Sequence, residues 1–99
     1  MTDRELLEAA AKAAGLGVTV PVFGVPPFMG LRLIGGALWN PLADDGDALR
    51  LAVKLDLTVM IGAVRDVSGQ LFLDKSEDDL EATRRAIVRA AAAIGKEMK

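Results

Sequence analysis

The chain of 99 residues contains no cysteine, no histidine and no tyrosine. Without cysteine it has no disulfide framework and no thiol chemistry, which fits a reducing cytoplasm. Without histidine it lacks the commonest general base and metal ligand, so a serine triad and a Cys-His pair are both excluded. Carboxylates and lysines remain, but no spacing singles out a catalytic pair. We therefore expect no enzyme, no cofactor and no metal site, with carboxylate-based catalysis as a minor alternative.

Charge is also absent from the stretch between Ala13 and Leu31. A membrane-spanning helix needs about 20 apolar residues. This stretch, however, contains Pro21, Pro26 and Pro27 together with four glycines, which break a helix repeatedly. We therefore expect strands and turns there. We expect no signal peptide and no membrane association, and a cytoplasmic location.

Length and net charge narrow the class of protein further. Ninety-nine residues suit one domain, which we place at residues 1–99. The formal net charge is −2, whereas a domain that binds nucleic acid usually carries a basic balance. We therefore expect a protein partner, whose identity the sequence does not give, rather than nucleic acid. A homo-oligomer stays open.

The segment from Trp39 onward combines a proline stop with a helix start. Pro41 fixes its own φ and favours an extended backbone at Asn40, so a strand or loop ends there. Asp44 is a good N-cap, and Asp47 follows three residues later, where it meets the positive end of the helix dipole. We expect Trp39 to pack over the helix that follows.

Periodicity predicts an α+β fold with the order helix, two strands, helix, two strands, helix. The expected architecture is one four-stranded, largely antiparallel sheet with the helices packed on it. The helices are expected at 2–14, 44–55 and 76–95, and the strands at 17–24, 29–38, 56–65 and 70–73. The strand at 56–65 is placed centrally because both of its faces are mostly apolar.

Turn and cap residues support this order. Thr2 and Glu5 form a capping box, and Gly15 is expected to end the first helix. Pro21 indicates an edge strand or a bulge. The segment 66–69 predicts a hairpin turn, and Ser76 is expected to cap the last helix.

Helical spacing also predicts which side chains are buried. The central helix is expected to bury Leu49, Ala52 and Val53. The last helix is expected to bury a second stripe and to pair Glu81, Arg85 and Arg89 at i, i+4 on its outer face. That stripe consists of Leu80, Ile87, Ala91, Ile94 and Met98.

Two patches in the second half of the chain carry a family resemblance. Residues 39–49 contain Trp-Asn-Pro-x-x-x-Asp followed by Asp-Ala-Leu, and residues 84–89 are Arg-Arg-Ala-Ile-Val-Arg. These patches resemble small phage and prophage proteins of unknown function, similar to the NinX family. That family has no settled activity, so the resemblance implies origin and fold rather than chemistry.

The apolar segment 18–38 suggests the preferred function. It is apolar on both faces of its expected hairpin, so it is either well covered or part of an interface. Phe23, Phe28 and Met29 are the candidate partner surface. We therefore expect a small accessory protein of phage or prophage origin that acts as a non-enzymatic protein-interaction module.

Three arginines provide the alternative function. Arg84, Arg85 and Arg89 of the last helix are candidates for contact with phosphate or an acidic partner. The simpler interpretation is a solvated helix face paired with Glu81. The alternative is thus a weak nucleic-acid-associated module.

Two further groups each allow a functional and a structural interpretation. Trp39 and Asn40 are a candidate pocket for a small ligand or peptide, or else a core tryptophan and a loop amide bonded to its own backbone. Asp44, Asp45 and Asp47 offer oxygen ligands, but their spacing fits no calcium loop, so a helix cap is preferred.

Overall fold

The computed structural model describes residues 2–16, 18–21, 31–33, 38–74 and 78–98. Within these ranges there are three helices and six strands, which confirms the α+β class. The elements are α1 (Asp3–Ala13), β1 (Val18–Pro21), β2 (Leu31–Leu33), β3 (Leu38–Trp39), α2 (Asp45–Lys54), β4 (Thr58–Met60), β5 (Ala63–Arg65), β6 (Leu71–Leu73) and α3 (Asp79–Glu97).

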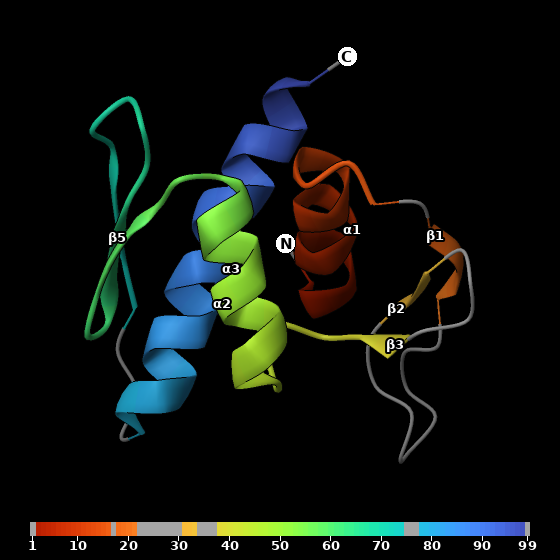
Figure 1. The fold of residues 1–99 in the computed structure, drawn as a ribbon, viewed down its shortest axis with the longest axis horizontal. Coiled ribbons are helices and arrows are strands. Elements are labelled where there is room, and N and C mark those ends of the chain that lie inside the picture. Colours follow the sequence, from red (N-terminus) through yellow and green to blue (C-terminus); the bar gives the residue numbers. More distant parts are fainter. Residues whose placement is uncertain (1, 17, 22–30, 34–37, 75–77, 99) are drawn as a thin grey trace.

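The described strands form two separate antiparallel sheets, β1-β2-β3 and β4-β5-β6. The helices stand between the two sheets (Figure 1). The prediction of one four-stranded sheet, with two strands on either side of α2 in sequence, is therefore wrong. Each half of the chain contributes three short strands, because both long apolar runs are divided. The run predicted at 29–38 supplies β2 and β3.

The run 56–65, predicted as one central strand, is a hairpin. Met60 lies opposite Ala63, so Ile61 and Gly62 form the turn between β4 and β5. Gly62 has φ +70°, a conformation that favours glycine, and its N–H donates to Thr83 Oγ1 of α3 at 2.9 Å. A glycine within an apolar strand pattern was the signal for this turn.

The local predictions at turns and at the start of the chain are confirmed. Thr2 and Glu5 form the capping box of α1. Gly15 has φ +72°, and the Leu16 N–H donates to the Ala11 carbonyl at 2.9 Å, which is a Schellman-type stop. β1 is an edge strand, and its register with β2 shifts between Val18 and Val20. Pro21 indicated an edge strand or a bulge, and β1 is an edge strand with an irregular register.

The hairpin turn at 66–69 is also confirmed. The Asp66 N–H donates to the Gln70 carbonyl at 3.0 Å, and Gly69 has φ +93°. The Asp66 carboxylate accepts hydrogen bonds from the Ser68 hydroxyl and from two backbone N–H groups. The Ser68 hydroxyl contributes most to lowering the pKa of Asp66 below its ordinary value.

The second helix has the predicted N-cap, but the face that it buries differs from the predicted one. Asp44 caps α2 and accepts from the Asp47 N–H at 3.0 Å. Its buried residues are Ala48, Leu51 and Ala52. Of the face predicted from spacing, only Ala52 is buried, whereas Leu49 and Val53 are exposed. Both stripes have helical spacing, so packing against α3 decides between them.

The last helix begins later than predicted. Asp78, rather than Ser76, caps α3 and accepts from the Leu80 N–H at 2.9 Å; Ser76 itself lies outside the described residues. Of the predicted stripe, Ile87 and Ala91 are buried, Ile94 is half-buried, and Leu80 and Met98 are exposed. Small residues make most of the buried face of α3. They are Ala82, Ala86, Ala90, Ala91, Ala92 and Gly95.

These small side chains let α1 and α3 pack closely. A Cβ placed on Gly95 would overlap the Ala9 carbonyl group of α1. Alanine at this position would force the two backbones apart, so glycine is retained inside α3 despite its poor helix propensity. Among the described residues, no helix has the length and apolar character needed to cross a membrane.

We predict that Gly95→Ala destabilises the protein by about 1–3 kcal/mol, because overpacking outweighs the gain in helix propensity. The measurement is urea-induced unfolding followed by far-ultraviolet circular dichroism. The matched control is Gly46→Ala in α2, where the nearest atoms belong to the side-chain end of Arg50 at 3.3 Å rather than to a backbone. The control should be neutral or stabilising by up to about 1 kcal/mol. Equal stabilisation of both variants would contradict the close packing of α1 on α3.

Candidate functional site

The predicted partner surface cannot be placed. Phe23, Phe28 and Met29 lie outside the described residues. The interface predicted for them therefore stays a prediction.

Trp39 and Asn40 belong to the core and to the start of α2. Trp39 is buried in the main hydrophobic cluster. The Asn40 N–H donates to Asp47 Oδ2 at 3.0 Å, and Asn40 Oδ1 accepts from the Leu42 N–H at 3.1 Å. The Asn40 carbonyl accepts from the Asp44 N–H at 2.8 Å. These bonds connect β3 to the helix cap, which agrees with the structural interpretation of the pair.

The structure separates the three candidate arginines. Arg84 points toward α2, where its Nε donates to the Leu42 carbonyl at 2.9 Å and its Nη1 to Asp45 Oδ1 at 2.6 Å. Only 16% of its side chain is exposed. Arg84 therefore fixes α3 to the loop before α2 and offers little to an external ligand.

Arg85 and Arg89 lie on a different side of α3 and meet acids from other elements. Arg85 Nη1 is 3.0 Å from Asp3 Oδ1 of α1, and this hydrogen bond is the main cause that raises the pKa of Arg85. Arg89 Nη1 donates to the Leu73 carbonyl at 2.7 Å and lies 3.3 Å from Asp74 Oδ2. The described residues show no salt bridge of either arginine with Glu81, so that predicted pairing is wrong.

We predict that Arg84→Met lowers the free energy of unfolding by about 1–2 kcal/mol, because it removes a charged donor from the Leu42 carbonyl. The control is Arg4→Met, which removes an exposed i, i+4 pair with Glu8. Such a pair contributes about 0.5 kcal/mol or less. Urea unfolding of both variants tests the difference. An Arg84 variant as stable as the Arg4 variant would contradict the structural role.

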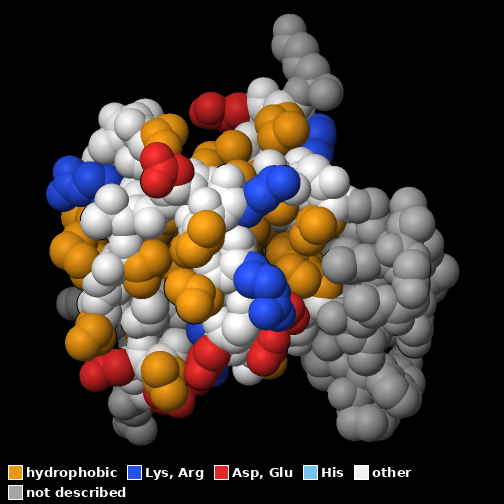
Figure 2. Space-filling view, viewed as in Figure 1, with side chains coloured by type: hydrophobic (Ala, Val, Ile, Leu, Met, Phe, Trp, Pro, Cys, Tyr) orange, Lys and Arg blue, Asp and Glu red, His pale blue; other side chains and the backbone are white. Residues whose placement is uncertain are grey.

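The outer face of the β4–β6 sheet carries an exposed apolar row. Met60, Ala63 and Leu73 lie side by side across the three strands. Met60 is 46% exposed and Leu73 55%, and Ile61 at the adjoining turn is 77% exposed. Val64, in the neighbouring row, faces inward and is fully buried. Figure 2 shows hydrophobic side chains gathered at the edge of the molecule where this sheet lies.

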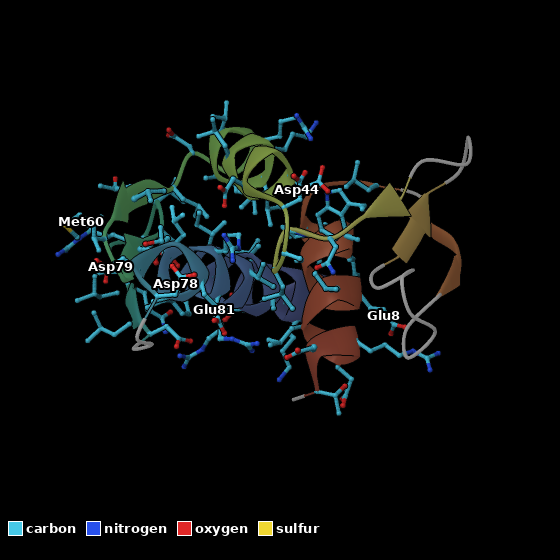
Figure 3. All side chains as sticks on the ribbon, turned by 90° about the horizontal axis from the view of Figure 1, so that it is seen from below. Glu8, Asp44, Met60, Asp78, Asp79 and Glu81 are labelled. Atoms are coloured by element: carbon cyan, nitrogen blue, oxygen red, sulfur yellow. The ribbon has the colours of Figure 1, made fainter. Side chains whose placement is uncertain are left out.

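An acidic rim borders this row. A groove of about 430 Å³ runs between the sheet and the start of α3 and includes Asp79 in its wall. Asp78 and Glu81 are exposed nearby, and Figure 3 shows Met60, Asp78 and Asp79 at the same end of the molecule. Within the described residues, neither Asp79 nor Glu81 forms a salt bridge. We call this site the acidic groove; its lining is Ile61, Gly62, Ala63, Leu73, Asp74, Asp79 and Ala82.

A second groove, of about 490 Å³, continues along α3 toward its C-terminal end. It shares Asp74 with the acidic groove but carries cations on its rim. We call it the cationic groove; its lining is Leu6, Phe72, Asp74, Arg85, Arg89, Ala92, Ala93 and Lys96. The sequence correctly predicted that Arg85 and Arg89 share one face of the last helix. It did not predict the other walls of the groove, because they come from α1 and β6.

Comparison of the chain with protein-family models, with curated proteins and with solved structures gives no match. The resemblance to the NinX family therefore stays a prediction. The part of the chain that the structure describes contains no group of three or more acidic, histidine or cysteine residues arranged to hold a metal ion.

Proposed function

We propose that the protein is a non-enzymatic interaction module that binds a basic, amphipathic segment of a partner protein in the acidic groove. The observation that supports this most directly is the exposed apolar row, Met60, Ala63 and Leu73 with Ile61 at its end, beside the carboxylates at the start of α3. A phage or prophage origin and a cytoplasmic location are part of the same proposal. They rest on the sequence patches at 39–49 and 84–89 and on the absence of cysteine.

The apolar row favours a protein partner because it is contiguous. Single exposed apolar residues are common on protein surfaces, whereas adjoining ones mark interaction sites. Covering such surface contributes about 25 cal/mol for each Å² removed from water. Met60 of the row belongs to β4, which pairs only with β5 among the described strands and carries neither charge nor proline. Charge or proline on an edge strand hinders its pairing with another chain, and β4 has neither.

The acidic rim determines the charge of the partner. Asp79 and Glu81 suit the N-terminal end of the α3 dipole, which accounts for their presence there. Their exposed carboxylates still give this end of the groove a negative potential. Lysine or arginine flanking an apolar stripe would complement it, and such complementarity raises association rates and selects partners.

We predict that an amphipathic peptide built from Lys and Leu binds the acidic groove, and that Ile61→Lys weakens binding by at least about tenfold. The substitution removes an apolar contact and adds a repulsive charge. The matched control is Leu49→Lys, at a position 63% exposed on α2, which should change affinity by less than about twofold. Fluorescence anisotropy of the labelled peptide gives the affinities.

A Glu/Leu peptide of equal length tests the charge requirement. If it affects the amide signals of residues 60–63 as strongly as the Lys/Leu peptide does, the proposed complementarity is wrong. Sedimentation measures the oligomeric state of the free protein, and so tests whether a second copy of the chain occupies the acidic groove. The free protein could prove to be a dimer that Ile61→Lys dissociates, and the native chain could fail to bind the peptide. These two results together would show that the acidic groove binds a second copy of the chain rather than a basic segment.

The nucleic-acid alternative receives less support from the geometry. Arg84, Arg85 and Arg89 each contact a carboxylate within the chain, so a phosphate would have to compete with those acids. We predict no electrophoretic mobility shift of DNA or RNA at micromolar protein and low salt, where phosphate contacts are strongest. A shift that disappears in the Arg85→Ala/Arg89→Ala double variant would instead favour the nucleic-acid function.

A further inference from the structure

We infer that the cationic groove is a second binding site, which takes a small organic anion: a carboxylate or phosphate group carried on a short apolar body. This inference does not depend on the acidic groove being occupied. It rests on the shape of the groove, on its apolar floor and on one cation, Lys96, that forms no salt bridge with any described residue.

The shape follows from the spacing along α3. Arg85, Arg89, Ala93 and Lys96 follow one another at helical intervals along one stripe of the helix. The small side chains of Ala92 and Ala93 leave a depression between the longer cationic ones. Its volume of about 490 Å³ falls in the range of roughly 300–1,000 Å³ that small-molecule sites occupy.

The floor of the depression is apolar and continuous with the core. Leu6 of α1 and Phe72 of β6 are half-buried and pack against the main hydrophobic cluster. Ala92 is buried, and Ala93 is half-buried. The ligand body that fits here is therefore apolar, because a polar one would lose hydration without gaining hydrogen bonds.

The charges at the rim are unequal. The lining holds three cations and one carboxylate, Asp74, which pairs with Arg89. Arg85 pairs with Asp3. Lys96 forms no salt bridge with any described residue, and its attraction to Glu5 is the smallest of the causes that lower the pKa of that carboxyl. Its ammonium group can therefore still approach an anion.

The arginines retain donors despite their ion pairs. Arg89 uses Nη1 for both of its contacts, and Arg85 uses Nη1 and Nη2. A guanidinium has five N–H donors in a fixed planar arrangement. An anion near Lys96 can therefore accept from Arg89 without breaking the bond to Asp74.

The test uses octanoate as the probe and follows amide and methyl chemical shifts by nuclear magnetic resonance. We expect saturable shifts at Leu6, Phe72 and Ala93, and none at residues 60–63. Lys96→Gln should weaken octanoate binding by roughly two- to fivefold, the effect of one exposed ion pair. The matched control is Lys54→Gln on α2, which should leave binding unchanged. Because Lys96 and Lys54 are both exposed, neither variant should affect folding.

Further arms separate the two parts of the ligand. Ala93→Leu fills the depression and should abolish saturable binding, while circular dichroism confirms that the variant is folded. 1-Octanol tests the apolar body alone, inorganic phosphate tests the anion alone, and octyl phosphate compares the two head groups. Equal binding of 1-octanol and octanoate, or octanoate shifts that Ala93→Leu and Lys96→Gln leave unchanged, would overturn the inference. Octanoate shifts confined to residues 60–63 would overturn it as well.

Discussion

The close approach of α1 and α3 at Ala9 and Gly95 is the contact on which the rest of the molecule depends. α3 packs against α1, against α2 and against the β4–β6 sheet, so these parts share it, while the β1–β3 sheet contacts α1. Five of its eight buried residues are alanine, and the backbones can therefore lie close together. Both grooves run along this helix, so their positions follow from the helix packing. A change in the spacing of α1 and α3 would alter the cationic groove, whose walls include Leu6 of α1.

The charge along α3 follows the helix dipole, with acids near the first turn and Lys96 near the last. Tertiary contacts then determine which of these charges remain available. Arg84 is used to hold α2, and Arg85 and Arg89 are paired with Asp3 and Asp74. Asp79, Glu81 and Lys96, in contrast, form no salt bridge with any described residue. This distribution is why the two grooves are expected to select ligands of opposite sign.

Local features of the fold could be predicted from the sequence because their causes lie within a few residues. The Thr2 capping box, the Asp44 cap and the Gly69 turn are of this kind. The buried face of α2 could not be predicted from the sequence. Two stripes of this helix have the same helical spacing, and only packing on α3 determines which of them is buried. The contact of Arg84 with Asp45 spans 39 residues and has no local signal. The apolar row was missed for a related reason: its members occupy one face only because the run 56–65 turns back at Gly62.

We propose that the apolar row is open to solvent in the free protein and that a basic partner covers it. Paramagnetic relaxation of methyl signals by a soluble gadolinium chelate tests it most directly. We predict strong relaxation at Met60, Ile61 and Leu73 in the free chain, comparable to that of the exposed Leu49. Addition of the Lys/Leu peptide should protect the first three and leave Leu49 unchanged. Protection of Met60, Ile61 and Leu73 already present in the free, monomeric protein would contradict the account.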